Sequence, residues 1–180
     1  MLFSYQECLL KYRSDYQIKK AIKRKELYQI EKGIYSDCKV VSPTEILAKK
    51  YPNAIVTMHS AFYYYGLTNT IPEYSYLATD RNAAKIRDNR VKQCFIPKDV
   101  LEFGVIEDVQ KDITIRIYSK ERMLIELVRN KSKLPYDYYK EIIKCYRNMV
   151  DKLDIQEIQK ASLIFPKSNK IMKRLQSEVF

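Results

Sequence analysis

The stretch from Ser14 to Tyr35 reads S-D-Y-Q-I-K-K-A-I-K-R-K-E-L-Y-Q-I-E-K-G-I-Y. It predicts a short basic helix over about 15–25, followed at once by a β-hairpin with strands at about 27–31 and 34–37. Ser14 and Gln17 have the spacing of a capping box, and Gly33 supplies the positive φ that a tight turn needs. A cationic helix beside a basic hairpin is typical of a winged helix-turn-helix, which indicates a nucleic-acid-binding module at the N-terminus.

A helix over about 4–12 precedes the basic helix and begins at a second capping-box pair, Ser4 and Glu7. Only two or three residues connect the two helices, which is typical of a helix-turn-helix. Ile18, Ala21 and Ile22 recur at helical spacing and should face the core. We therefore predict a DNA-binding module over residues 1–40.

The outer side of the basic helix carries the candidate DNA contacts. Lysine and arginine position a protein on phosphates, whereas residues near the start of a recognition helix read bases. Gln17 can pair with an adenine edge, and Lys20 can reach guanine acceptors. A solvated helix face without a ligand is the alternative. The predicted DNA-binding residues are Ser14, Tyr16, Gln17, Lys19, Lys20, Lys23, Arg24 and Lys32.

Composition points to a polyanionic partner. The 180 residues carry a formal net charge of +11, and 46% are hydrophobic, enough for a real core. A lysine-rich solvated surface would also explain the charge. The sequence has no membrane-length apolar run and no signal-peptide layout, so we expect a cytoplasmic protein without a membrane partner. The four cysteines are too far apart for a zinc site and are predicted to be buried or half-buried thiols.

The rest of the chain, residues 41–180, predicts a larger mixed α/β domain that ends in a helical bundle, so the predicted fold class is α+β. Ser42 and Glu45 form a third capping-box pair. Extended stretches rich in aromatic and β-branched residues alternate with polar turns, and the C-terminal third is helical. The expected helices lie at about 43–51, 57–65, 153–164 and 168–178, with one more capped by Ser119 and another that begins at Pro135. The expected strands lie at about 74–79, 91–96, 103–107 and 113–118.

Two further basic clusters have several interpretations. Arg81, Lys85, Arg87 and Arg90 lie in a loop or short helix between two strands, where they could extend a DNA footprint, face an acidic partner, or be plain surface charge. Near the C-terminus, a helical stripe of basic residues has no assigned role. It comprises Lys167, Lys170, Lys173 and Arg174.

Catalytic chemistry is not indicated. His59 is the only histidine, and at a helix start it is expected to cap or pack. Glu107, Asp108 and Asp112 could bind magnesium, but adjacent acids between strands are typical of a hairpin turn. The run Tyr63–Tyr65 could stack on bases, although core packing is favoured. We expect no enzyme activity, no metal and no cofactor.

The order of several motifs resembles the AbiEi family of type IV antitoxins, which are bacterial transcriptional regulators. The matching segments are Leu27–Tyr35, Ser60-Ala61 with Gly66-Leu67, Pro72 with Tyr76–Thr79, and Ile117–Arg122. The resemblance implies an N-terminal winged helix and a C-terminal antitoxin domain. It also implies repression of the protein's own operon through inverted repeats in promoter DNA, with possible self-association on that DNA.

The same resemblance implies a functional partner, a nucleotidyltransferase-like toxin that the antitoxin opposes without a stable complex. The alternative hypothesis is a non-enzymatic protein- or RNA-interaction module with basic surfaces. A metal-dependent nuclease built on Glu107, Asp108 and Asp112 is a third possibility.

Overall fold

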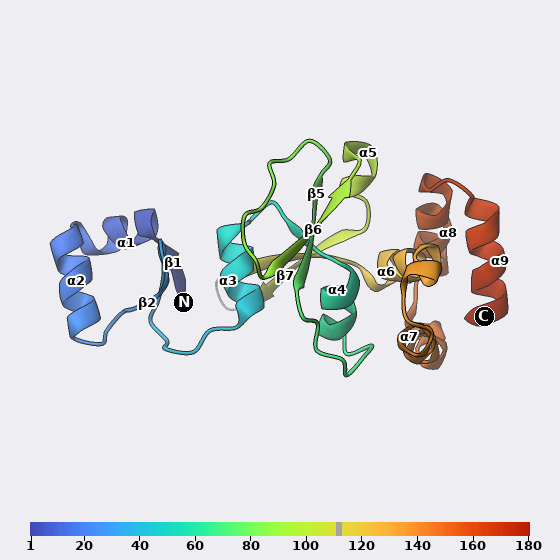
Figure 1. Ribbon diagram of the computed structural model, residues 1–180, viewed down its shortest axis with the longest axis horizontal. Helices are drawn as coiled ribbons and strands as arrows, with labels where there is room; N and C mark the ends of the chain where they lie inside the picture. Colours follow the sequence, from blue (N-terminus) through green and yellow to red (C-terminus); the bar gives the residue numbers. More distant parts are fainter. Residues whose placement is uncertain (111–112) are drawn as a thin grey trace. The chain divides into compact units, whose positions relative to one another are not determined.

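The computed structural model describes residues 1–110 and 113–180, and it has a mixed α+β fold with two sheets (Figure 1). The predicted fold class is thereby confirmed at this level. The chain divides into two compact units. The first comprises Met1–Ala54 with Glu107–Arg116, and the second comprises Ile55–Ile106 with Ile117–Phe180.

The first unit begins with a strand that the sequence did not indicate, β1 (Leu2–Ser4). Helices α1 (Tyr5–Tyr12) and α2 (Asp15–Lys23) follow, then strands β2 (Tyr28–Glu31) and β3 (Ile34–Ser36). The sheet is antiparallel with the order β1-β3-β2. Helix α3 (Pro43–Lys50) packs against β1 and β3. Its expected capping box is absent, because the Ser42 side chain makes no cap hydrogen bond.

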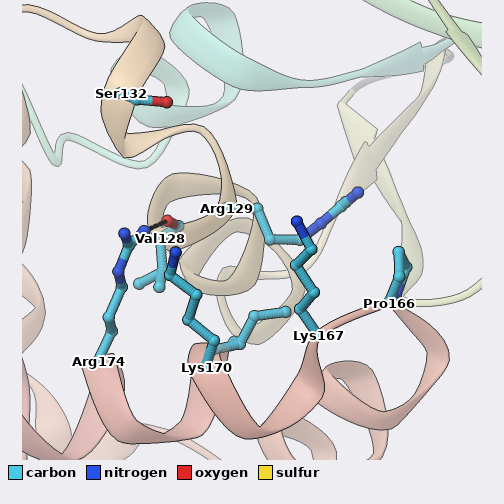
Figure 2. Close-up of a pocket in the computed structure, with 8 residues that line it drawn as sticks. Val128, Arg129, Ser132, Pro166, Lys167, Lys170 and Arg174 are labelled. Atoms are coloured by element: carbon cyan, nitrogen blue, oxygen red, sulfur yellow. Dashed lines mark hydrogen bonds between the residues drawn. The ribbon is translucent and has the colours of Figure 1, made fainter.

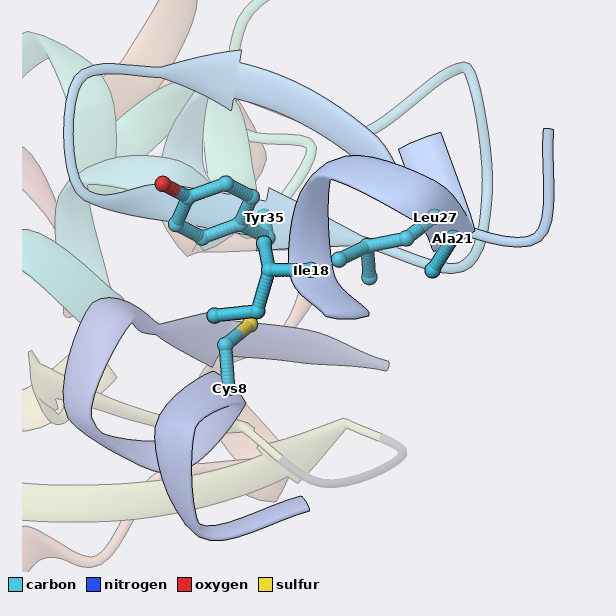
Figure 3. Close-up of a cluster of buried hydrophobic side chains, with 5 residues drawn as sticks. All are labelled: Cys8, Ile18, Ala21, Leu27 and Tyr35. Atoms are coloured by element: carbon cyan, nitrogen blue, oxygen red, sulfur yellow. The ribbon is translucent and has the colours of Figure 1, made fainter. Parts of the chain in front are cut away.

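A small buried cluster holds the two N-terminal helices to the hairpin (Figure 3). Its members come from α1, α2, the connection after α2, and β3: Cys8, Ile18, Ala21, Leu27 and Tyr35. The expected inward positions of α2 are confirmed for Ile18 and Ala21, and Ile22 is partly buried against the cluster. Burial raises the pKa of the Cys8 thiol, as expected for a packing cysteine. Cys38, in contrast, is exposed, which corrects the prediction for that residue.

The larger sheet has the strand order β6-β5-β4-β8-β7. The strands are β4 (Ile55–Val56), β5 (Ser75–Asp80), β6 (Val91–Ile96), β7 (Val105–Gln110) and β8 (Ile113–Tyr118). Strand β4 is antiparallel to β5 and parallel to β8, whereas β5 and β6 are parallel and joined by the loop 81–90. Short helices α4 (Met58–Tyr64) and α5 (Lys98–Leu101) complete this part of the chain.

The C-terminal third is helical, as predicted. It contains α6 (Lys120–Arg129), α7 (Tyr136–Asn148), α8 (Ile155–Ile164) and α9 (Ser168–Glu178), with 3₁₀ turns at Lys131–Lys133 and Val150–Lys152. Helix α6 packs against α4, α8 and α9, and seven of its ten residues are buried. No helix in the described part of the chain combines the length and the apolar character that crossing a bilayer requires.

Arg122 of α6 is fully buried at the centre of the second unit. Its guanidinium lies 4.6 Å from the ring centroid of Tyr118 and 4.4 Å from that of Phe165, and it is paired with Glu126 at 2.9 Å. Gly104 passes so close that a Cβ there would lie 2.8 Å from the Arg122 Cβ, and its φ of +71° also favours glycine. The Arg122 Nη1 donates to the Val100 and Phe103 carbonyls at 3.2 and 3.3 Å, which ties α6 to the segment around α5. The pair with Glu126 lies within α6 and keeps the buried guanidinium from being left without a counter-charge.

Candidate nucleic-acid interface

Helix α2 is fixed at its N-terminus by two side-chain contacts. The Ser14 hydroxyl accepts the Gln17 backbone N–H at 3.3 Å, as the predicted cap requires. The Tyr5 hydroxyl donates to Asp15 Oδ1 at 2.8 Å, which ties the start of α2 to the start of α1. This hydrogen bond to a carboxylate raises the pKa of Tyr5, so the hydroxyl keeps its proton. The orientation of α2 on its unit is therefore set by polar contacts as well as by the buried cluster.

The outer face of α2 is exposed and helical, as predicted. Tyr16 is 70% exposed, and Ser14 is half-buried with its oxygen already in the cap. The remaining predicted residues on this helix and its C-cap are all exposed: Gln17, Lys19, Lys20, Lys23 and Arg24. Their contact with DNA stays a prediction. The structure brings them together on one solvated surface, which we call the α2 basic face and define as Lys19, Lys20, Lys23 and Arg24.

The α2 basic face is not neutralised by ion pairs within the described part of the chain. Among the described residues, none of its four side chains makes a hydrogen bond or an ion pair, and the nearest acid on the helix, Asp15, is held by Tyr5. Lys19 with Lys23, and Lys20 with Arg24, are i,i+4 pairs of like charge. Each such pair destabilises a helix by roughly 0.2–0.5 kcal/mol. A bound polyanion would remove this repulsion.

The hairpin places one more predicted residue at a turn. Lys32 is exposed at the β2–β3 turn, next to Gly33 with φ +82°. The Gly33 carbonyl accepts the Tyr5 N–H at 2.9 Å, which ties this turn to the start of α1. Glu31, beside the turn, is paired with Lys50 at 3.5 Å, so its negative charge is neutralised. The turn therefore presents a cation without an adjacent unpaired acid.

Three other basic residues of the first unit lie near α2 but are not part of the α2 basic face: Lys11, Arg13 and Lys25. Lys11 lies 4.4 Å from the ring centroid of Phe3 and 5.6 Å from that of Tyr12, so its charge already has partners. Arg13 and Lys25 flank α2 with φ values of +66° and +60°. This left-handed conformation costs a non-glycine residue about 1 kcal/mol, and sequence patterning gave no signal for it.

The segment 81–90, which carries Arg81, Lys85, Arg87 and Arg90, is a loop; the sequence predicted either a loop or a short helix there. Gln93 holds it in place: its side-chain nitrogen donates to Thr79 Oγ1 at 2.8 Å, and its oxygen accepts the Ile86 N–H at 2.8 Å. Arg90 is paired with Asp88 through two hydrogen bonds of 2.9 and 2.7 Å, so its role is structural. The exposed cations that remain in this loop are Arg81, Lys85 and Arg87.

His59 packs as expected. Its ring stacks on Tyr76 with centroids 4.6 Å apart and on Tyr138 with centroids 4.9 Å apart. Burial, with a smaller contribution from Lys92, lowers the pKa of His59 and keeps the imidazole neutral. Its Nδ1 and the Tyr138 hydroxyl are buried without hydrogen-bond partners.

Two minor predictions need correction. Tyr63 is 43% exposed rather than buried, because α4 uses Ala61 and Phe62 for its core face and consecutive helical residues point about 100° apart. Glu107 and Asp108 lie within β7, not in a turn, since an end strand of a sheet tolerates charge. Their partner in the nuclease hypothesis, Asp112, lies outside the described residues. The described residues contain no group of three or more metal-ligating side chains.

Comparison with known proteins adds no assignment to this geometry. No protein-family model matches the chain, and a search of curated proteins found no significant match.

Proposed function

We propose that the N-terminal residues 1–40 form a winged helix-turn-helix that binds double-stranded DNA, with α2 in the major groove and the β2–β3 turn on the adjacent backbone. The element order β-α-α-β-β, in which β1 pairs with β3 and β3 with β2, supports this interpretation. So does the two-residue connection, Arg13-Ser14, between α1 and α2.

The observation that carries the proposal is the α2 basic face, exposed and without intramolecular partners on a helix whose start is fixed by Ser14 and Asp15. Each cation that neutralises a phosphate releases condensed counterions. The logarithm of the affinity therefore falls with the logarithm of the salt concentration, with a slope of about 0.9 per phosphate contact. Gln17 lies in the first turn of α2, where base edges are read, and Lys20 lies further along the same helix.

We further propose that the protein is a transcriptional autorepressor and the antitoxin of a type IV toxin–antitoxin system. This rests on the motif order that resembles the AbiEi family, and it makes the protein a cytoplasmic, non-enzymatic regulator. The C-terminal region would oppose a nucleotidyltransferase-like toxin without forming a stable complex. Binding to inverted repeats would place two copies on one operator.

Fluorescence anisotropy with the DNA upstream of the protein's own gene tests the regulator function. A shuffled duplex of the same length and composition is the control. Specific sites are typically bound more tightly than non-specific DNA by a factor of about 10³ or more. Equal affinity for the two duplexes would contradict the proposal. Co-expression with the toxin encoded beside it tests the antitoxin function, since growth should be restored only in the presence of this chain.

The second candidate function is an RNA- or acidic-protein-binding module. It is favoured by the loop cations Arg81, Lys85 and Arg87, which Gln93 fixes in place without neutralising them. Nuclease-sensitive RNA that co-purifies with the parent, and is lost in a variant with all three cations changed to alanine, would support it over the DNA proposal.

A further inference from the structure

Three residues of the C-terminal basic stripe, to which the sequence assigned no role, line a cavity in the second unit: Lys167, Lys170 and Arg174. The cavity has a volume of about 360 Å³ and lies between the end of α6 and the start of α9 (Figure 2). Its apolar part is formed by Val128 and Ile171, both buried. The volume is at the lower end of the range for small-molecule sites, about 300–1,000 Å³.

Four of the lining side chains are cationic. Lys167, Lys170 and Arg174 follow one another along one face of α9, and Figure 2 shows all three directed from α9 toward α6. Arg129 enters from the end of α6, and Ser132 supplies a neutral hydroxyl. No carboxylate is among the lining residues. The fourth cation of the stripe, Lys173, is exposed but does not line the cavity.

Two of the four cations are oriented by the protein itself. Arg129 binds both carboxylate oxygens of Glu126, at 3.1 and 3.0 Å, and lies 3.6 Å from the ring centroid of Phe165. Arg174 donates through Nη1 to the Val128 carbonyl at 3.1 Å. One hydrogen bond uses only one of the five N–H donors of a guanidinium, so Arg174 is held in place with donors to spare.

Lys167 and Lys170, the other two cations, are not held in place by a protein group that the structure describes. Among the described residues, neither Lys167 nor Lys170 makes a side-chain hydrogen bond or ion pair, although both line the cavity. Lys167 also has φ +66°, a conformation that costs a non-glycine residue about 1 kcal/mol. Helix α9 starts there without a side-chain cap, which adds the positive end of its dipole to the same wall.

We propose that this cavity binds the phosphate groups of a small polyphosphate, such as the diphosphate or triphosphate part of a nucleotide. Arg174 and the two lysines would bind phosphate oxygens, Ser132 would donate a hydrogen bond, and the apolar part would contact the rest of the ligand. The site is separate from the α2 basic face, and it does not depend on DNA binding.

Isothermal titration calorimetry of the full chain with inorganic pyrophosphate tests the proposal at low ionic strength. Because a net charge of +11 attracts any anion, the control must lose the same charge elsewhere. The test variant is Lys167→Ala with Lys170→Ala. The matched control is Lys144→Ala with Lys173→Ala, two exposed lysines outside the cavity.

We expect saturable one-to-one binding to the parent and to the control, and affinity at least about tenfold weaker in the test variant, the scale of one or two charge-assisted hydrogen bonds. Lys170→Arg, which keeps the charge, should retain binding. Absence of saturable binding to the parent, or equal loss in the test and control variants, would overturn the proposal. So would a test variant that loses affinity for a DNA duplex but not for pyrophosphate, since the phosphates recognised would then be those of a nucleic acid.

Discussion

Replacing Lys20 and Lys23 together by alanine should weaken DNA binding and leave the folded protein about as stable as the parent. Both side chains are exposed, and among the described residues neither makes a hydrogen bond or an ion pair. The double variant removes the i,i+4 repulsions of Lys19 with Lys23 and of Lys20 with Arg24. Removing these repulsions contributes roughly 0.2–0.5 kcal/mol each, and it offsets the lost interaction of two last-turn cations with the helix dipole. The free energy of unfolding should therefore change by less than about 1 kcal/mol.

On DNA the same change removes two phosphate contacts. At about 0.9 per contact, the slope of log affinity against log salt concentration should fall by about 1.8. Anisotropy titrations of the promoter duplex at several salt concentrations measure the slope, and urea unfolding measures stability. The control is Lys144→Ala with Lys173→Ala, which changes the net charge equally and should leave the slope nearly unchanged.

The two measurements separate a lost contact from unfolding. Weaker binding in a protein that is about as stable as the parent cannot arise from unfolding. An unchanged salt slope in the double variant, or an equal decrease in the control, would refute the assignment of α2 as the DNA-contacting helix.

Three further changes test the packing on which the account depends. Ile18→Ala should destabilise the first unit by about 2–4 kcal/mol in urea unfolding, because the side chain is 3% exposed within the buried cluster; a loss below about 1 kcal/mol would contradict that packing. Glu126→Gln should cost the second unit about 3–5 kcal/mol, since it leaves Arg122 buried beside a neutral partner, and a near-neutral effect would argue against the ion pair. For His59 the folded pKa lies below the unfolded value of about 6.5, so the unfolded chain binds more protons and stability should fall as pH drops below about 6.5. His59→Phe keeps an aromatic ring between Tyr76 and Tyr138 and should remove that part of the pH dependence. If thermal unfolding of the variant and of the parent depended on pH equally between pH 7 and 5, this role of His59 would be contradicted.

The longer elements could be predicted from the sequence because particular residues, the capping serines and a turn glycine, mark where they begin or end. Ser4, Ser14 and Ser119 accept the N–H groups that begin their helices, and glycine at position 33 has the positive φ of the turn. The strands β1 and β4 and the helix α5 were missed because two to four residues show no periodicity. Their pairing is decided by neighbours that are distant in the sequence.

The two candidate sites also differ in how far the sequence alone could predict them. The α2 basic face lies on one helix, so helical spacing was enough to collect its residues. The cationic cavity combines Arg129 with Lys167 and Lys170, about 40 positions further along the chain. Only the packing of α6 against α9 brings these side chains together, and the sequence alone showed no more than an exposed stripe.

Lysine reactivity with and without DNA tests the central claim most directly. The protein is treated with an amine-reactive reagent, alone and saturated with promoter duplex, and modification is measured by peptide mass spectrometry. We expect the duplex to protect Lys19, Lys20 and Lys23, while Lys144 and Lys173 react as before. Unchanged reactivity of the three α2 lysines in the complex, or protection confined to the second unit, would contradict this claim.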